Sequence, residues 1–155
     1  MAMKIEPGKP GWQKSHVALY LKTDGADGHE VDFGLPGVVP VHCLLLQTTG
    51  RKSHAAQTTP LIYGKDGNGF VIVASRGGAP THPAWFLNLR DHPEVRFQVG
   101  NKKYRGTARI TVGGERAQLY VMMTGLYPPY RDYQAKTSRE IPVVVLEPKE
   151  EVVRL

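Results

Sequence analysis

Two short segments of this sequence combine glycine with basic and hydroxyl side chains. Residues 48–54 (TTGRKSH) follow an apolar run, and residues 75–78 (SRGG) follow a β-branched run. Glycine allows backbone N–H groups to turn toward a ligand, and arginine binds phosphate or carboxylate oxygens through a planar fork of donors. From residue 50 to residue 76 the cations Arg51, Lys52, Lys65 and Arg76 face one acid, Asp66. The pattern predicts a site for an elongated polyanionic ligand, although a solvated basic loop is the simpler alternative for either segment alone.

The neighbouring residues predict that both segments follow β-strands. Residues 41–47, 58–63 and 70–74 are apolar or β-branched runs that suit strands and are short for helices. Residues 66–69 (DGNG) are a strong signal for a hairpin turn. Because hairpin connections place alternate strand ends together, we expect the two basic segments to approach one another.

Three tyrosines recur at three-residue intervals around a proline pair. Tyr127, Tyr130 and Tyr133 lie in the sequence LYPPYRDYQ, which favours a turn followed by a helix. Three phenols on one side of such an element can simply pack at a rim. They can also line a site where a planar ligand stacks on the rings and a hydroxyl donates to developing negative charge.

The remaining chain adds helices and strands around this centre. We expect residues 1–11 to be a mobile lead-in and residues 22–40 to be mostly loop. Helices are expected at residues 12–21, at residues 82–91 with Thr81 as cap, and at residues 115–124; strands are expected at residues 94–99, 104–112 and 141–146. The order predicts a mainly β, α+β fold, an antiparallel barrel of about six strands with peripheral helices.

The composition is that of one ordinary globular domain. The chain has 155 residues, a formal net charge of +6, 41% hydrophobic and 22% charged residues. We expect a lead-in, helix and loop in residues 1–40, a barrel in residues 41–148 and an exposed charged tail in residues 149–155. No secretory signal pattern begins the sequence, so a cytoplasmic location is expected, and peripheral contact with the inner membrane face is compatible with it.

Several function classes are disfavoured by the residue pattern. The aromatic residues do not alternate with basic ones, so we do not expect nucleic acid as partner. Neither a dinucleotide-binding glycine motif nor a phosphate-binding P-loop occurs. The six histidines lack zinc-site spacing, and we expect no metal. The single cysteine, Cys43, is expected to be a buried small hydrophobe.

Six segments give the chain a resemblance to a known family. TTGRKSH, QTTPLIYGKDG, VIVASRGGAPTHPAWFLNL, HPEVRFQVG, YPPYRDYQAKT and IPVVVLEP lie between residues 48 and 148, within a resemblance that covers about residues 44–148. Together they resemble the deazaflavin-dependent nitroreductases, small actinobacterial-type oxidoreductases that bind coenzyme F-420, an 8-hydroxy-5-deazaflavin with a polyglutamate tail. The resemblance implies a split β-barrel and places the N-terminal helix near the mouth of the site.

The resemblance also implies roles for individual residues. Arg51, Lys52 and Ser53 would hold the phosphate and acidic tail, and Gln57, Thr58, Thr59, Pro60 and Leu61 would line the cofactor. Ser75, Arg76, Gly77 and Gly78 would surround its ring-to-tail region, with Pro83, Ala84, Trp85 and Tyr130 along it. Tyr130 and Tyr133 would orient the electron acceptor, with Tyr127 and Ser75 as further catalytic candidates.

The implied reaction is hydride transfer from reduced coenzyme F-420 to a small electrophilic acceptor. The acceptor classes are quinones, activated alkenes and nitro compounds. Gln57 stands where many relatives carry a basic residue, which would weaken binding of the tail without abolishing it. Ile62 stands where some nitro-reducing members carry tyrosine, so a quinone or enone is the preferred expectation. An upstream enzyme would reduce the cofactor.

Two alternatives remain open at the level of sequence. One is an FMN-dependent oxidoreductase on the same kind of barrel, which would use the same basic segments. The other is a non-catalytic carrier of deazaflavin or an apolar ligand. A homodimer is compatible with a small strand-rich barrel, but no residue pattern specifies it.

Overall fold

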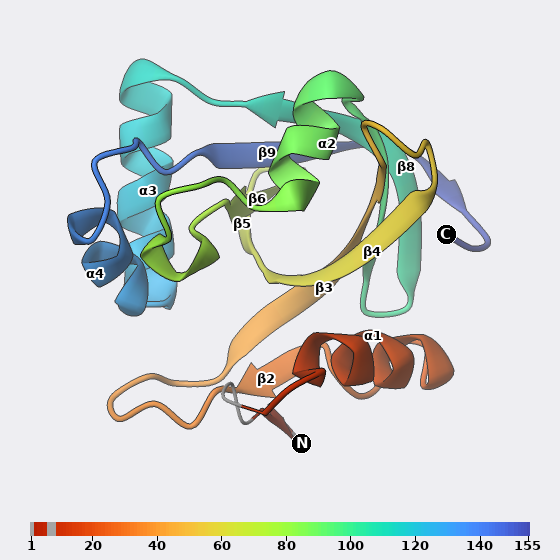
Figure 1. Cartoon of the computed structure of the whole chain (residues 1–155). Helices are drawn as coiled ribbons and strands as arrows, with labels where there is room; N and C mark the ends of the chain where they lie inside the picture. The colour runs from red at the N-terminus through yellow and green to blue at the C-terminus, as the bar shows by residue number, and fades with distance from the viewer. Residues whose placement is uncertain (1, 6–8) are drawn as a thin grey trace.

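A strongly curved sheet encloses the core of the molecule (Figure 1). The computed structural model describes residues 2–5 and 9–155, and the strands within them follow the order β1-β2-β3-β7-β8-β9-β6-β5, with β4 paired to β3. The strands are β1 (Met3–Lys4), β2 (Glu30–Asp32), β3 (Val41–Thr49), β4 (Ala56–Ile62), β5 (Gly64–Asp66), β6 (Gly69–Val73), β7 (Glu94–Val99), β8 (Lys102–Ile110) and β9 (Val143–Val152). In the described part of the chain β4 does not pair with β5 or β6, so the barrel is split there.

The expected split barrel with peripheral helices is confirmed, with additions near the N-terminus. Residues 22–40, expected to be mostly loop, contain β2, which pairs with the start of β3. β1 pairs with β2 in parallel, and Ile5 is buried beside Val31 and Cys43. The expectation of a mobile lead-in is therefore wrong for residues 3–5, because this segment closes a small apolar cluster. Residues 1 and 6–8 of that lead-in lie outside the described residues.

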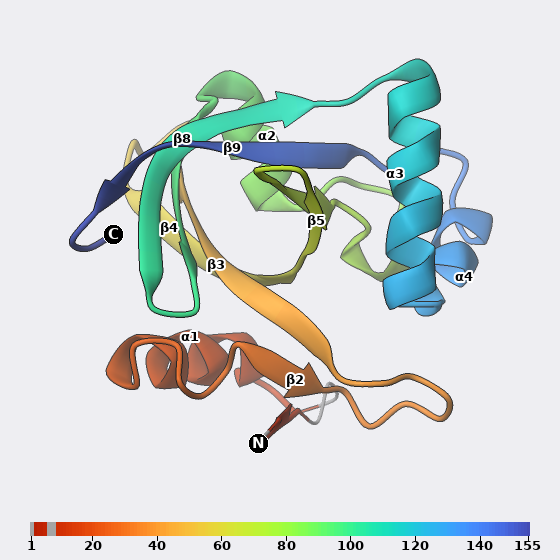
Figure 2. The ribbon, with the colours of Figure 1, turned by 180° about the vertical axis from the view of Figure 1, so that it is seen from behind.

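Four α-helices surround the sheet, and their bounds are α1 (Trp12–Lys22), α2 (Ala84–Asp91), α3 (Gly113–Leu126) and α4 (Pro129–Ala135). Figure 1 shows α1 and β2 as a layer beside the barrel and α2 across the barrel end. Seen from behind in Figure 2, α3 and α4 lie together near the start of β9. The expectation that Thr81 caps α2 is wrong, because Pro83 precedes the first helical residue in an extended conformation.

Strand β6 and the first four residues of β9 (143–146) are buried on both faces, which explains their unbroken apolar sequences. Phe70 and Ile72 point into the barrel core with Phe97 and Trp85. Val71 and Val73 point to the outer face, where α3 and α4 cover them. One pair of strands therefore joins the barrel core to the layer that carries the tyrosines.

The charged end of the chain continues the sheet instead of leaving it. β9 runs through Val152, where it pairs with Lys103 of β8. Arg105 forms ion pairs with Glu94 and Glu150 across the exposed sheet face. Exposed pairs of this kind contribute roughly 0–1 kcal/mol each, so backbone pairing is the main reason the segment is ordered.

Candidate active site

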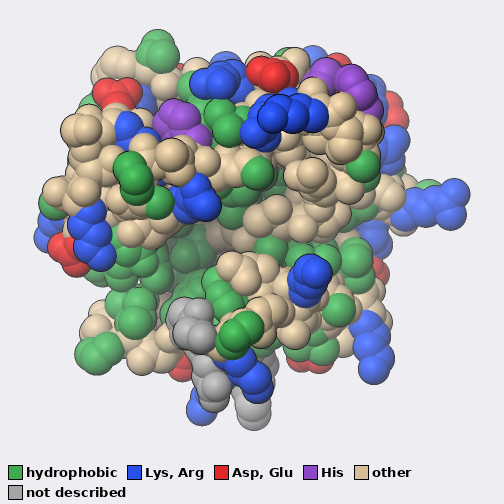
Figure 3. Space-filling model, viewed as in Figure 1, with side chains coloured by type: hydrophobic (Ala, Val, Ile, Leu, Met, Phe, Trp, Pro, Cys, Tyr) green, Lys and Arg blue, Asp and Glu red, His purple; other side chains and the backbone are tan. Residues whose placement is uncertain are grey.

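A groove of about 570 Å³ runs between the α1 layer and the barrel. Figure 3 shows the hollow across the front of the molecule, with apolar side chains in it and basic side chains above it. Its walls come from α1, the segment after β2, β4, the end of β6, the start of α2 and the tyrosine segment. A concave, largely apolar site of this volume suits a small organic ligand or cofactor.

Aromatic side chains form a connected row along one end of the groove. The ring of Trp12 on α1 lies 6.2 Å from the ring of Phe33, which lies 5.7 Å from the ring of Tyr127. Tyr130 is 5.0 Å from Tyr127 and 6.1 Å from Tyr133, centroid to centroid. Edge-to-face contacts at these distances are favourable, so the row holds the N-terminal layer against α4.

Burial keeps the groove phenols in their neutral, proton-donating form. Tyr130 has 5% of its surface exposed, and burial raises its pKa well above the ordinary value. Burial also raises the pKa of Tyr127, with further contributions from the neighbouring Tyr133. Burial raises the pKa of the Cys43 thiol, at the floor of the groove, to about 12, so this cysteine is the uncharged small hydrophobe that the sequence predicts.

The basic segment after β6 forms a 3-10 turn, η1 (Arg76–Gly78), held by Arg139. The Arg139 guanidinium donates to the carbonyl oxygens of Ala79 (2.9 Å), Ala74 (3.2 Å) and Ser75 (2.8 Å). It also contacts Nδ1 of His82 at 3.0 Å. Since one side chain gathers carbonyl groups on both sides of the turn, Arg139 fixes the shape of this groove wall.

The basic segment after β3 is fixed by Asn88 of α2, which is 1% exposed. Its Oδ1 accepts from the backbone N–H of Arg51 at 3.1 Å and from the Arg51 guanidinium at 3.3 Å. Its Nδ2 donates to Gln57 at 2.9 Å and to Thr48 at 3.2 Å. The Asn88 amide thus makes four hydrogen bonds to three residues, Arg51, Thr48 and Gln57, and is part of the buried side of the helix.

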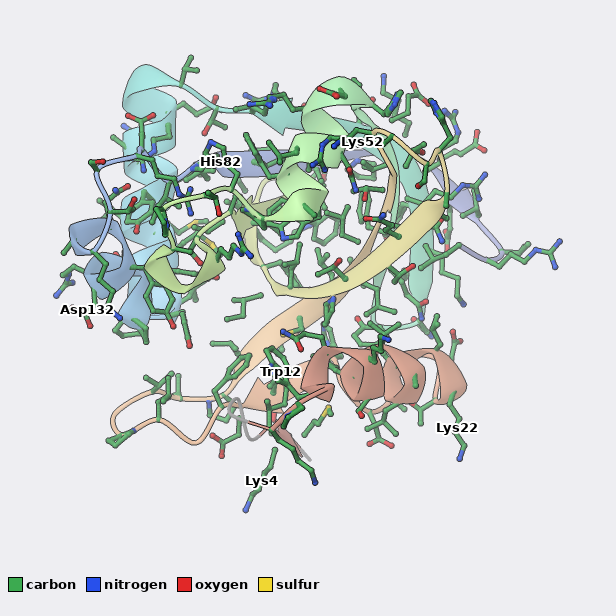
Figure 4. All side chains as sticks on the ribbon, in the orientation of Figure 1. Lys4, Trp12, Lys22, Lys52, His82 and Asp132 are labelled. Atoms are coloured by element: carbon green, nitrogen blue, oxygen red, sulfur yellow. The ribbon has the colours of Figure 1, made fainter. Side chains whose placement is uncertain are left out.

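Helix α2 links the two basic segments. Trp85 in its first turn lines the groove, and Asn88, about 4.5 Å further along the axis, holds Arg51. Figure 4 shows Lys52 and His82 above the groove and Trp12 below it. The two basic segments, after β3 and after β6, are therefore connected through helix α2. Their cations are spread along this helix and are not gathered at one point.

The chain matches the sequence profile of the F420H(2)-dependent quinone reductase family over residues 12–148. The chain belongs to this family. An F420H(2)-dependent quinone reductase of Mycobacterium tuberculosis is 41% identical over 134 residues, which are 84% of this chain and 86% of the relative. The structure of an F420-H2 dependent reductase (FDR-A) superposes with a TM-score of 0.64 at 40% identity, covering 68% of this chain and 93% of the other.

As a member of this quinone reductase family the chain is an F-420-dependent oxidoreductase, as the sequence predicts. A further solved structure, described as a domain-swapped dimer, has a TM-score of 0.64 and 40% identity, and covers 68% of this chain and 79% of the other. None of the helices in residues 2–5 and 9–155 is long and apolar enough to cross a membrane.

The residues present fit a deazaflavin with an acidic tail. The groove offers apolar walls and aromatic rings for a planar ring system, and Arg76 at its wall begins a series of cations that continues to Arg51 and Lys52. Eleven of the predicted residues line the groove: Thr59, Pro60, Leu61, Ser75, Arg76, Gly77, Pro83, Trp85, Tyr127, Tyr130 and Tyr133. Seven others are outside its lining, on the loop after β3, on β4, in η1 and on α2: Arg51, Lys52, Ser53, Gln57, Thr58, Gly78 and Ala84.

Four residues of this quinone reductase site escaped the sequence reading. Phe33 and His16 line the groove from segments interpreted as loop and packing helix. Asn88 hydrogen-bonds to Arg51, which is 37 positions away in the sequence. Arg139 hydrogen-bonds to residues that are 57–65 positions away. The only local signal was the polar Asn88 within the otherwise apolar run of residues 84–89, which indicates a buried polar role.

Proposed function

We propose that this protein reduces quinones with hydride supplied by reduced coenzyme F-420. The observation that supports the proposal is the aromatic groove with Arg76 at its wall, in a member of the F-420-dependent quinone reductase family. Quinones are planar, uncharged and rich in acceptor oxygens, and the groove matches them with apolar walls and neutral phenols. The relatives whose names include a quinone acceptor cover most of the chain.

The chain's own residues bind and orient both reactants. Trp85, Pro60 and Leu61 contact the ring system, and Gly77 permits close approach of the ligand to the backbone. Arg76 binds the first anionic group, and Arg51 and Lys52 bind the acidic tail further along α2. Asn88 holds the Arg51 segment in place, so less conformational entropy is lost on binding.

Tyr130 and Tyr133 donate hydrogen bonds to the acceptor oxygen on which negative charge develops. Such donors stabilise the transition state most when they are fixed and shielded from water. Tyr130 meets both conditions, since it is buried and its backbone carbonyl accepts a hydrogen bond from Tyr120 of α3. Ser75 is buried and lines the same groove at the end of β6, and it is a secondary donor.

A cofactor titration tests the first half of the proposal. Oxidised coenzyme F-420 and, in parallel, FMN are added to the purified protein while Trp12 and Trp85 emission is followed. We expect F-420 to bind preferentially, with salt-sensitive affinity, and Arg51→Ala to weaken binding by about 10-fold because a charged hydrogen bond is lost. Lys22→Ala, at the far end of α1, is the matched control. Preference for FMN would identify the alternative flavin enzyme.

Acceptor turnover tests the second half. The loaded protein should oxidise reduced F-420 when menadione is added, and Tyr133→Phe should lower kcat/KM by about 100-fold through loss of an oxyanion donor. Tyr104→Phe, a phenol of the barrel core outside the groove, should retain activity. Tight cofactor binding with no turnover of menadione or related acceptors would indicate the carrier instead.

We further propose a homodimer in the cytoplasm. The support for the dimer is the domain-swapped relative at 40% identity. Light scattering of the purified chain distinguishes monomer from dimer, and fractionation of cells distinguishes a cytoplasmic from a peripheral membrane location.

A further inference from the structure

His16 is a buried titratable residue in the groove wall without a part in the reaction described above. It lies one helical turn after Trp12 on α1, lines the groove and is 1% exposed. Its Nε2 lies 2.8 Å from the carbonyl oxygen of Gly28. Because a carbonyl can only accept, Nε2 carries the proton and Nδ1 of the neutral ring is left as an acceptor.

The orientation of the ring is fixed by the same contact. A Cβ atom added at Gly28 would lie 3.2 Å from Cδ2 and 3.4 Å from Nε2 of His16, so this edge of the ring faces the Gly28 loop. Nδ1 is on the opposite side of the ring, away from that loop, in a residue that lines the groove. A rotation of the ring by 180° would replace Nε2 with a carbon and lose the Gly28 hydrogen bond.

Nδ1 of His16 is buried and has no hydrogen-bond partner among residues 2–5 and 9–155. A buried acceptor without a partner costs roughly 1–3 kcal/mol, and such costs persist in proteins mainly at functional positions. Burial also lowers the pKa of His16, which keeps Nδ1 unprotonated near neutral pH. An unsatisfied lone pair is therefore held within a residue that lines the groove.

We propose that Nδ1 of His16 accepts a hydrogen bond from a hydroxyl group on the aromatic ligand in the groove. The inference rests on the proposed function, and it makes His16 a residue that determines ligand specificity. The hydroxyl comes either from the reduced acceptor, a hydroquinone, or from the 8-hydroxyl of the deazaflavin ring. If it comes from the acceptor, the groove prefers the hydroquinone to the quinone, whose oxygens are acceptors and repel the Nδ1 lone pair.

Two substitutions separate this role from a structural one. In His16→Gln the amide reaches the Nε2 position, so its NH₂ group can still donate to Gly28 while the Nδ1 acceptor is lost. In His16→Asn the amide oxygen reaches the Nδ1 position while the Gly28 hydrogen bond is lost. If His16 has only a structural role, glutamine should preserve the properties of the wild type better than asparagine. If His16 binds the ligand, asparagine should preserve ligand binding better than glutamine.

The test uses a redox-inert pair of probes, 2-naphthol and 2-methoxynaphthalene. In the second probe a methyl group replaces the hydroxyl hydrogen, so only 2-naphthol can donate a hydrogen bond. Calorimetric titration of the full-length protein should show about 10-fold tighter binding of 2-naphthol. His16→Gln should remove this preference, and His16→Asn should retain most of it. Equal affinity of the wild type for both probes, binding of neither, or an unchanged preference in His16→Gln would overturn the proposal.

Saturation with oxidised F-420 identifies the source of the hydroxyl. If the preference for 2-naphthol persists with the cofactor bound, His16 contacts the acceptor. If the cofactor displaces both probes and His16→Gln weakens cofactor binding, His16 contacts the deazaflavin hydroxyl. Failure of the proposed function would appear separately, as absence of F-420 binding or of menadione turnover in the wild type.

Discussion

Arg139 is the side chain on which the shape of the groove wall depends most directly. Its guanidinium donates to the carbonyl oxygens of Ala74, Ser75 and Ala79, on both sides of η1. The planar fork reaches these acceptors simultaneously, which a single ammonium group cannot do. The positive charge beside Ser75 and Arg76 also adds to the attraction of the wall for an anion.

We expect Arg139→Lys to lower the free energy of unfolding by about 2 kcal/mol, because hydrogen bonds to charged groups are lost while the charge remains. Urea denaturation measures this, and F-420 titration should show weaker binding in parallel. Arg131→Lys, an exposed arginine on α4, is the control and should match the wild type. Unchanged stability in Arg139→Lys would mean that η1 keeps its shape without the guanidinium.

At the residue scale, the sequence predicts groove residues where residue type and a local turn are enough to indicate them. Ser75, Arg76 and Gly77 were predicted because a strand end, a cation and a glycine are adjacent in the chain. Asn88 and Arg139 were not, because their partners are brought to them only when the sheet folds. Their types alone are equally consistent with a solvated surface residue.

At the scale of elements, the glycine pair of η1 allows α4 to approach the end of β6. Both glycines have positive φ, 64° at Gly77 and 84° at Gly78. A Cβ added at Gly78 would lie 2.8 Å from the carbonyl oxygen of Tyr133, whereas one added at Gly77 would meet no atom within 4 Å. Gly78 thus allows the close approach of η1 and α4, whereas Gly77 is needed only for the turn itself.

The two glycines therefore give a paired prediction. Gly77→Ala should cost about 1–2 kcal/mol of stability from the left-handed backbone alone. Gly78→Ala should cost at least about 3 kcal/mol, because the same strain is joined by a clash with backbone that forces α4 outward. Urea denaturation of both variants measures the difference. Equal costs would contradict the close approach of α4 to η1.

Element order was largely predictable, and element boundaries near the N-terminus were not. The apolar runs of β6 and of residues 143–146 and the alternation of β7 are strong signals, because these segments are buried on one or both faces. β1 and β2 are two and three residues long, and their sequences carry no periodicity. They are strands because β2 pairs with the start of β3 and β1 pairs with β2, which is a tertiary effect.

At the scale of the whole molecule, three histidines connect the α1 layer, the barrel and the groove wall. His16 joins α1 to the Gly28 loop, His29 contacts the Tyr63 hydroxyl at 2.7 Å, and His82 contacts Arg139. Burial is the main cause that lowers the pKa of each; His42 adds to it for His29, and Arg139 for His82. The folded chain therefore holds all three mainly as neutral imidazoles at neutral pH.

This arrangement predicts lower stability in mild acid. Each histidine has a folded-state pKa below its unfolded value of about 6.5, so the unfolded chain binds more protons as the pH falls through that range. The free energy of unfolding should thus be greatest above about pH 7 and decrease toward about pH 5, until the folded-state groups also protonate. Urea denaturation at fixed ionic strength measures the slope, and His16→Gln should reduce it because one of the three groups no longer titrates. A free energy of unfolding that stays constant or increases over this range would show that these imidazoles are protonated without loss of their contacts, and that the layers of the molecule are held by the aromatic row alone.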